Sequence, residues 1–400
     1  MDADRIRTLA EAQRAYVVAA RRRIHERPEL SFEEKETAAF VADELRRCGL
    51  DVREGFGGGY GVVADLAGAR PGPTIALRAD MDALPVQEEN DHPFRSQRPG
   101  VMHACGHDAH TAVLLGAARA LAEARDQIAG RVRFLFQPAE EKPPGGALGM
   151  IEASCLEGVD AVFGLHQSAR DDPGAMLFAT GPRSASADTF TLTVRGRGGH
   201  GAMPQLSIDA IQVAAQLVSA IHQIVSRRVP PSEPAVISIG TLHGGTKENI
   251  IAHEVTMTGT VRALSQGVRE SIHRELHAVA RGVTEAWGAA YELDYLWGYP
   301  VLVNDAAMTD LARRAAALAL GEAAIRPAGP PVMPAEDFAR YLEKVPGCFA
   351  SLGVGVPDTD RRAPSHSGAF MLDESGLPAG VAWYLSLVMN FETLRDTGTM

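Results

Sequence analysis

The chain has 400 residues, of which 46% are hydrophobic and 22% are charged, and its formal net charge is −11 at pH 7. This length exceeds what one hydrophobic core usually organises, so we expect a globular protein with two domains. The negative net charge argues against nucleic acid as a partner, because phosphate backbones are bound by basic surfaces. No apolar run is long enough to span a bilayer.

The N-terminal segment and the cysteines indicate the compartment. The apolar stretch 16–20 is shorter than the hydrophobic part of a signal peptide. Four cysteines occur without a CxxC pair, which is typical of free thiols in a reducing compartment, so we expect a cytoplasmic protein. Three of them are interpreted as small buried hydrophobic residues: Cys48, Cys155 and Cys348.

Helices alternate with short β-rich runs in the first part of the chain. Residues 5–49 are expected to be helical, with Ser31 and Glu34 forming a capping box at a helix start. Strands are predicted at 60–66, 74–78, 131–137 and 161–165, and a helix at 109–124 separates the two pairs. This alternation predicts an α/β fold with a largely parallel sheet, covered by helices on both faces.

The segment 184–298 is predicted to be a separate domain. Its expected strands are 189–195, 235–242, 255–261 and 291–296, and its expected helices are 208–228 and 268–287. The resulting order, βαββαβ, is that of a ferredoxin-like unit. We therefore predict one α/β domain with a mixed, largely parallel sheet, formed by residues 1–183 and 299–400, into which the ferredoxin-like domain is inserted.

The densest group of reactive side chains is HACGHDAH, which covers residues 103–110 and precedes a predicted helix. Cysteine and histidine are ligands that suit zinc and similar metals. A polar helix cap is the alternative interpretation. Three histidines, a cysteine and an aspartate within eight residues favour a metal site, because loops at strand ends are where open α/β sheets bind ligands.

Further polar groups follow predicted strands or lie in loops. They are Asp80 and Asp82 in ADMDALP, the pair Glu140 and Glu141, His166 after a buried strand, and His366 in a Pro/Ser-rich loop. Taken singly, each is more typical of a structural or solvated residue. In irregular backbone, adjacent side chains point in different directions, so one glutamate of the pair can bind a metal while the other faces a reacting water.

These motifs together resemble the M20 metallopeptidase family, in particular its branch of N-acyl-amino-acid, hippurate and indole-acetyl-amino-acid amidohydrolases. The resemblance extends over nearly the whole chain, in the order HERPELSFEE, RADMDALP, MHACGHDAHTA, QPAEE, GLH, GGHGAMP, ENIIA, GTVRAL, AEDFA and SHSGAF. It implies two divalent metal ions per subunit, Mn²⁺ or Zn²⁺, in the domain 1–183 plus 299–400. The implied metal ligands are Cys105, His107, Glu141, His166 and His366, with Glu140 as general base and Asp82 as an acid that orients a ligand.

The resemblance also gives the inserted domain 184–298 a role as lid and dimerisation domain. His200 of GGHGAMP matches a histidine that family dimers insert into the partner's active site, so a homodimer is expected. Asn249 and Arg262 match positions that face the substrate, and a guanidinium can hold a carboxylate through two hydrogen bonds. Departures from the family pattern at 142–146, 167–170, 203–205 and 333–335 leave the ligands and the base in place, so they bear on specificity.

The implied function is metal-dependent hydrolysis of the amide bond of an N-acyl amino acid, a small-molecule substrate, to a carboxylic acid and a free amino acid. Metal ions would lower the pKa of a water molecule, Glu140 would carry its proton to the departing amine, and His200 would help to stabilise the oxyanion. Three alternatives stay open: a dipeptidase or aminoacylase with the same metal centre, a binding protein without catalysis, and a redox protein that uses Cys105. The redox alternative lacks a nearby resolving cysteine.

Two further expectations concern single residues. A neutral imidazole nitrogen has one lone pair, whereas a thiolate can serve two cations, so Cys105 is the expected bridge between the metals. The remaining histidines show no partner pattern and are interpreted as surface or structural residues: His25, His92, His222, His243, His253, His273 and His277.

Overall fold

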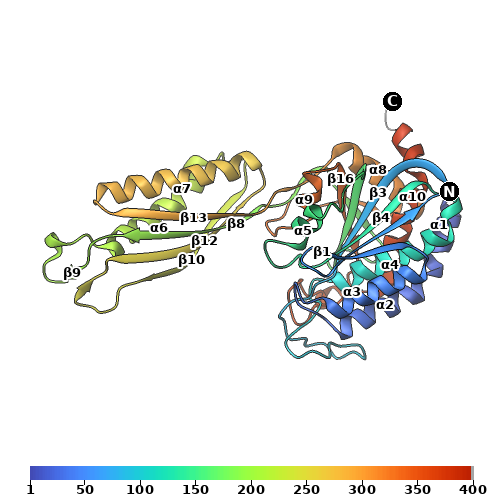
Figure 1. Ribbon diagram of the computed structural model, residues 1–400, viewed down its shortest axis with the longest axis horizontal. Coiled ribbons are helices and arrows are strands. Elements are labelled where there is room, and N and C mark those ends of the chain that lie inside the picture. Colours follow the sequence, from blue (N-terminus) through green and yellow to red (C-terminus); the bar gives the residue numbers. More distant parts are fainter. Residues whose placement is uncertain (398–400) are drawn as a thin grey trace. The chain divides into compact units, whose positions relative to one another are not determined.

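The computed structural model describes residues 1–397, which form two compact units (Figure 1). The larger unit contains Met1–Gly181, Val303–Pro330 and the chain from Asp337 onward. The smaller unit contains Pro182–Leu302 and Pro331–Glu336. The short segment 331–336 therefore lies with the smaller unit, although the sequence places it in the α/β domain.

An eight-stranded sheet forms the centre of the larger unit. Its strands lie in the order β1 (Asp51–Phe56), β2 (Gly61–Ala67), β4 (Ala129–Gln137), β3 (Arg70–Asp80), β5 (Ala161–Ser168), β16 (Gly347–Gly353), β6 (Met176–Phe178) and β15 (Ile325–Pro327). The central strands β4, β3, β5 and β16 are parallel, whereas β1, β2 and β6 each pair antiparallel with a neighbour. The predicted mixed, largely parallel sheet is confirmed.

The edge strand β1 is one of several elements of the larger unit that are not predicted from the sequence. It pairs with β2 from Asp51 opposite Asp65 to Phe56 opposite Gly61. Its first five residues are exposed or half-buried, so they carry no alternation of apolar and polar residues that would reveal a strand.

Helices cover both faces of this sheet. One face carries α4 (His107–Glu123) and α10 (Leu377–Thr397), together with α1 (Ala3–Ala12), α2 (Arg14–Glu26), α3 (Lys35–Arg47) and α8 (Ala306–Leu320). The opposite face carries α5 (Gly146–Glu152) and α9 (Ala339–Leu342). Side chains alternate along β3, so Leu77 points to the first face while its neighbour Arg78 reaches Asp337 beside α9.

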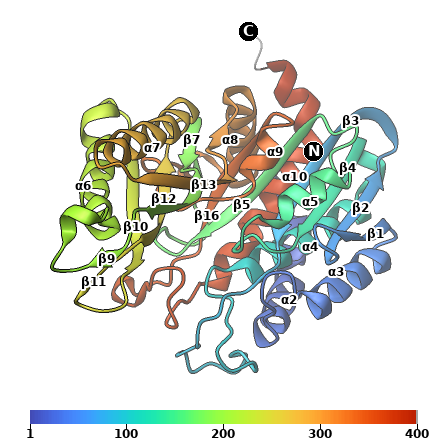
Figure 2. The same cartoon turned by 60° about the vertical axis from the view of Figure 1, so that its left-hand side comes forward.

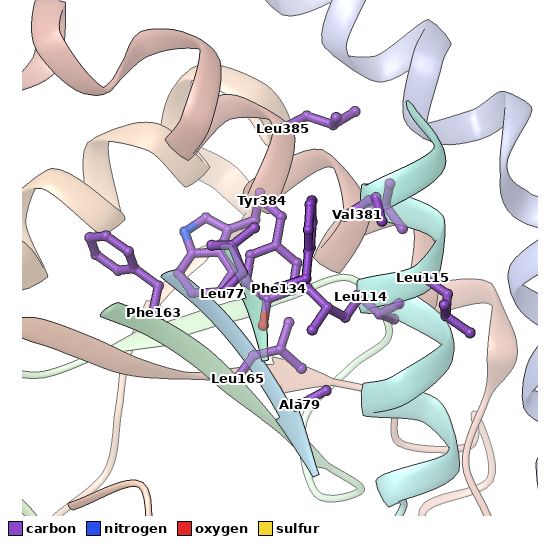
Figure 3. Close-up of a cluster of buried hydrophobic side chains, with 14 of the residues drawn as sticks. Leu77, Ala79, Leu114, Leu115, Phe134, Phe163, Leu165, Val381, Tyr384 and Leu385 are labelled. Carbon is purple, nitrogen blue, oxygen red and sulfur yellow. The ribbon is translucent and has the colours of Figure 1, made fainter. Parts of the chain in front are cut away.

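The main core lies between the sheet and α4 and α10. Figure 3 shows side chains of β3, β4 and β5 gathered with those of both helices: Leu77, Ala79, Phe134, Phe163, Leu165, Leu114, Leu115, Val381, Tyr384 and Leu385. Helix α10 is buried on nearly all sides, as its continuous apolar sequence requires. Burial of each large apolar side chain contributes about 1.5–3 kcal/mol to the free energy of unfolding, so this cluster holds β3, β4 and β5 against α4 and α10.

The predicted capping box of Ser31 and Glu34 is wrong. The backbone N–H groups of Glu36 and Thr37, at the start of α3, donate instead to the carboxylate of Glu29 at 3.0 and 2.8 Å. The side chains of Ser31 and Glu34 bond to other parts of the larger unit, because they find buried partners there.

The smaller unit has its own sheet and core. Its main elements are β8 (Ala187–Arg195), α6 (Ala210–Arg228), β10 (Ala235–Gly244), β12 (Glu254–Ala263), α7 (Gln266–Ala286) and β13 (Ala290–Tyr299). The strands form an antiparallel sheet in the order β10-β12-β8-β13. Figure 2 shows β10, β12 and β13 of this sheet together with α6 and α7. Alternate residues of β12, such as Val255 and Met257, are buried against α6 and α7. No helix in the described chain is long and apolar enough to cross a membrane.

Candidate metal centre

The five expected ligands all belong to the larger unit and come from four separate segments. Cys105 is the next-to-last residue of the loop 81–106 that follows β3, and His107 is the first residue of α4. Glu141 follows β4, His166 lies in β5, and His366 lies in the loop before α10. The loops at the carboxyl ends of parallel strands thus supply most of the group, as expected for an open α/β sheet.

The structure brings these side chains together in two overlapping groups. The ligand atoms of Cys105, His107 and His166 all lie within 4.8 Å of one another, and so do those of Cys105, Glu141 and His366. The Cys105 thiol is 3.4 Å from His166 Nε2, and Nε2 of His366 is 3.2 Å from Glu141 Oε1. Cys105 is the member that both groups share.

Backbone hydrogen bonds orient two of the histidines. Nδ1 of His166 donates to the carbonyl of Gln167 at 2.7 Å, which leaves Nε2 facing the thiol. His366 has a φ of +67°, which is uncommon for a residue with a side chain, and its N–H donates to the Ala104 carbonyl at 2.8 Å. This strained backbone holds the exposed imidazole of His366 beside Cys105.

Asp82 is the buried acid that orients His107. Its Oδ1 lies 3.1 Å from His107 Nδ1, and its Oδ2 accepts from the Ser31 hydroxyl at 2.7 Å and from the Glu141 N–H at 3.0 Å. Nε2 of His107 is buried without a hydrogen bond of regular geometry. A carboxylate behind an imidazole whose other nitrogen is unsatisfied is the usual arrangement around a metal-binding histidine.

The electrostatics of the group favour charged ligand forms. Burial would raise the pKa of the Cys105 thiol, but the charge of His166 and interactions with His107, His166 and His366 lower it to about 6. Burial would lower the pKa of His107, but the charge of Asp80 and the hydrogen bond to Asp82 raise it. The protein therefore stabilises a thiolate and, next to it, a positive charge, which are the conditions that a metal cation requires.

Glu140 lies beside this group. Ligand atoms of Glu140, His107 and Glu141 are within 4.8 Å of one another, and Glu140 is 7% exposed. The preceding Ala139 has a φ of +53°, and this left-handed turn lets the two adjacent carboxylates converge. Gly146 permits the turn, because a Cβ there would lie 1.9 Å from the carbonyl oxygen of Pro138.

Glu34 holds the same turn from the other side. Its Oε1 accepts from the Ala139 N–H at 2.7 Å, and the residue is fully buried. Burial and the negative charge of Asp82 raise the pKa of Glu34 to about 7 from its ordinary value of 4.5. The folded state therefore binds this proton more tightly than the unfolded state, and stability is lost as the pH rises from 4.5 through 7.

Glu34→Gln is expected to remove this pH dependence. The amide keeps an oxygen for the Ala139 N–H but does not titrate. Because one pKa unit corresponds to about 1.4 kcal/mol, the loss of stability between pH 5 and pH 8 should be smaller in the variant by up to about 3 kcal/mol. Urea unfolding at the two pH values measures the difference, and equal losses in both proteins would contradict the assignment.

His110, the last residue of HACGHDAH, has a structural role. Its Nδ1 lies 2.6 Å from Asp80 Oδ1, and its Nε2 accepts from the backbone N–H of Gln167 at 2.8 Å. Since a backbone N–H must donate, His110 is a neutral imidazole with both nitrogens engaged, and burial lowers its pKa to about 4. His110 therefore positions β5 against α4 and is not a metal ligand.

Three predicted site residues lie in the smaller unit. His200, in β9 (Gly199–His200), pairs with Ile250 of β11 (Ile250–Ile251), and the adjacent Asn249 accepts from the Gly201 N–H at 2.9 Å. Both side chains are exposed, and Arg262 is half-buried on β12. His200 and Asn249 thus share one local structure, and the roles of all three residues toward a substrate stay predictions.

Comparison with known proteins identifies the family. Residues 76–390 match the model of peptidase family M20/M25/M40. The chain is 42% identical to thermostable carboxypeptidase 2 of Saccharolobus solfataricus, over 94% of this chain and 95% of that protein. It is 44% identical to an N-acyl-L-amino acid amidohydrolase of Geobacillus stearothermophilus, over 76% of this chain and 82% of that protein.

A solved structure supports the same relationship. A dinuclear metal-binding M20 peptidase of Bacillus subtilis superposes with a TM-score of 0.83 and 34% identity, covering 95% of this chain and 99% of that one. The family match spans more than half of the chain, and two relatives exceed 40% identity over most of their length. The chain therefore belongs to peptidase family M20/M25/M40.

Proposed function

We propose that this protein is a metal-dependent amidohydrolase that cleaves the amide bond of N-acyl amino acids to a carboxylic acid and a free amino acid. The observation that carries the proposal is the convergence of a thiol, three imidazoles and a carboxylate, with the second carboxylate of Glu140 alongside. The similarity to an N-acyl-L-amino acid amidohydrolase supports the substrate class. A binding protein without catalysis would not need the buried Glu140 beside the ligands.

We infer two divalent cations, Mn²⁺ or Zn²⁺, with Cys105 as the bridging protein ligand. His107 and His166 would hold one ion, and Glu141 and His366 the other. The residues fit this pair because Cys105 belongs to both groups and because mixed sulfur, nitrogen and oxygen donors suit borderline divalent metals. The similar Bacillus subtilis peptidase is described as dinuclear. When bound, such ions polarise a carbonyl group and make water a better nucleophile at neutral pH.

The side chains then have distinct roles. The Glu140 carboxylate takes the proton of the attacking water and delivers it to the amine that leaves. Asp82 keeps a proton on His107 Nδ1, so that Nε2 presents its lone pair. His200 of a second copy would donate to the oxygen that becomes negative, which requires a homodimer formed through the smaller unit. Arg262 and Asn249 would hold the free carboxylate of the amino-acid half.

Carboxypeptidase activity is a second candidate, favoured by the relative from Saccharolobus solfataricus. The C-terminal residue of a peptide is also an acylated amino acid with a free carboxylate, so the same groups can act on it. The two activities differ in the acyl part, which is a small group in one case and a peptide in the other.

A substrate panel distinguishes these candidates. N-acetyl, N-benzoyl and indole-acetyl amino acids are compared with N-blocked dipeptides, after dialysis against a chelator and return of Mn²⁺ or Zn²⁺. We expect release of free amino acid that is lost without metal and restored by it, with higher kcat/KM for the small acyl groups. Higher kcat/KM for the peptides would make the protein a carboxypeptidase, and no hydrolysis with either ion would favour a binding protein.

Cys105→Ala tests the bridge. Without the shared thiolate we expect fewer than two ions per chain and a loss of hydrolysis, measured by elemental analysis and by turnover. Cys48→Ala, a half-buried cysteine outside both groups, is the matched control and should keep both ions. A Cys105→Ala variant that keeps both ions would show that the bridge is formed by another group.

We also propose that the protein works in the cytoplasm. All four cysteines are free thiols, and oxidation of Cys105 would remove a metal ligand, so a reducing compartment suits this site.

A further inference from the structure

A second group of metal-binding side chains lies outside the centre described above. It consists of His25 in α2 and of Glu88 and His92 in the loop 81–106. Their ligand atoms lie within 4.8 Å of one another, and the side chains of His25 and Glu88 are each 1% exposed. From the sequence, both histidines are expected to be surface or structural residues, and Glu88 belongs to no recognisable motif.

The distances match those between two ligands of one cation. Oε1 of Glu88 lies 3.1 Å from His25 Nε2 and 3.0 Å from His92 Nε2. Both distances also lie at the long end of the range for N–H···O hydrogen bonds, about 2.7–3.2 Å, and charge-assisted ones are usually shorter, about 2.7–2.9 Å. Neighbouring ligand atoms are about 3.0 Å apart around an octahedral ion and about 3.4 Å apart around a tetrahedral one, given metal–ligand bonds of about 2.1 Å.

A buried carboxylate fixes the protonation of His25. Oδ2 of Asp108 lies 2.8 Å from His25 Nδ1 and accepts from Arg21 Nε at 2.7 Å. Arg21 Nη2 also lies 3.2 Å from His25 Nδ1, but the shorter contact to a carboxylate, which can only accept, places a proton on Nδ1. Nε2 then directs either a lone pair or a second proton toward Glu88. This arrangement repeats the one formed by Asp82 and His107 in the metal centre.

The surroundings call for a positive charge at Nε2 of His25. Two buried carboxylates, Asp108 and Glu88, flank the imidazole, and Arg21 neutralises one of them. Beside His25, at a distance of 6.3 Å between ring centroids, His103 is buried with both ring nitrogens lacking hydrogen-bond partners. A buried ring nitrogen without a protein partner calls for a water molecule or an ion beside it.

We propose that His25, Glu88 and His92 bind an additional divalent cation, of the class of Zn²⁺ or Mn²⁺, separate from the pair at Cys105. The ion would enter beside His92, whose side chain is 14% exposed. Two imidazole nitrogens and one carboxylate oxygen are a donor set that both metals accept, with water completing the coordination.

This cation would tie an irregular loop to a helix. The loop 81–106 contains no helix or strand among the described elements, yet it carries Asp82 near its start and Cys105 near its end. Glu88 already holds the loop by accepting the Ser96 N–H at 2.6 Å through Oε2. A metal that joins Glu88 and His92 to His25 of α2 would fix the interior of the loop, because long loops without secondary structure otherwise sample many conformations.

The test compares the wild type with His92→Ala and Glu88→Gln after equilibrium dialysis against excess Zn²⁺. We expect each variant to hold one ion fewer per chain than the wild type by elemental analysis. Crystals of the wild type should show an anomalous peak between the three side chains, and crystals of the variants should not. Zinc should also slow proteolysis within residues 81–106 of the wild type more than in the variants.

His243→Ala, an exposed histidine of β10 in the smaller unit, is the matched control and should bind as much zinc as the wild type. The measured quantity is a difference of one ion, so the result does not depend on whether the pair at Cys105 is occupied. Equal zinc content in the wild type, His92→Ala and Glu88→Gln, with no anomalous peak at these side chains, would show that the group is a hydrogen-bonded ion network without metal.

Discussion

Glu140→Gln is expected to lower kcat by about 10²–10⁴-fold while the metal content stays that of the wild type. The amide has the shape of the carboxylate but cannot take a proton from water. Glu140 is buried within 4.8 Å of ligand atoms of His107 and Glu141, so it is placed to act as base without being one of the five proposed ligands. Steady-state kinetics with an N-acyl amino acid and elemental analysis of the same sample measure the two quantities.

Glu141→Gln is the matched control for this experiment. Glu141 lies in the group with Cys105 and His366, so its amide variant should lose metal, and excess metal should restore part of the activity. The two variants thus lose different functions: Glu140→Gln loses a proton acceptor, and Glu141→Gln loses a metal ligand. Wild-type kcat in Glu140→Gln, or loss of its metal, would remove Glu140 from the role of general base.

Most members of the candidate metal centre can be predicted from the sequence because their chemistry is local and distinctive. Cys105 and His107 stand in one dense motif, and Glu141 and His166 each follow or end a buried strand. The carboxyl ends of parallel strands meet at one edge of a sheet, so the sheet prediction and the ligand prediction support each other. His366 lies far downstream, and only the family resemblance placed it with the others before the structure did so.

The interactions behind the ligands are harder to predict from the sequence. Ser31 and Glu34 have the spacing of a capping box, yet they bond to Asp82 and to the Ala139 N–H, which are distant in sequence. Local pattern rules describe what a residue does when no tertiary partner is available. His25 likewise belongs to no local motif, and its partner Asp108 is identified only by the packing of α2 against α4.

A buried ion network next to the turn at Ala139 and Glu140 is likewise not predicted from the sequence. Asp337 is fully buried, and its Oδ1 accepts from Arg78 Nη2 and from Gln137 Nε2, both at 2.8 Å. Its Oδ2 accepts from the Ala147 N–H at 3.0 Å at the start of α5. Arg78, also buried, pairs with Asp80 at 2.7 Å. The network joins the segment of Asp337 to strands β3 and β4, which no periodicity in the sequence indicates.

Asp337→Ala is therefore expected to destabilise the larger unit by about 3–5 kcal/mol, because it removes one partner of a buried ion pair and leaves the other without full compensation. The two units need not unfold together, so amide hydrogen exchange of peptides from β3 and β4 is the suitable measurement. Asp310→Ala is the control, since Asp310 forms an exposed pair with Arg314 and its loss should cost under about 1 kcal/mol.

The variant also tests whether this network supports the active centre. The backbone N–H of Asp337 lies 3.4 Å from Glu140 Oε1, so a shift of this segment should also move the proposed base. We expect Asp337→Ala to lower kcat by a larger factor than it changes KM, even at temperatures where the larger unit remains folded. If Asp337→Ala loses no more stability than Asp310→Ala, Asp80 alone is sufficient to neutralise Arg78. If its kcat equals that of the wild type, Glu34 and Gly146 hold the turn at Ala139 and Glu140 without this network.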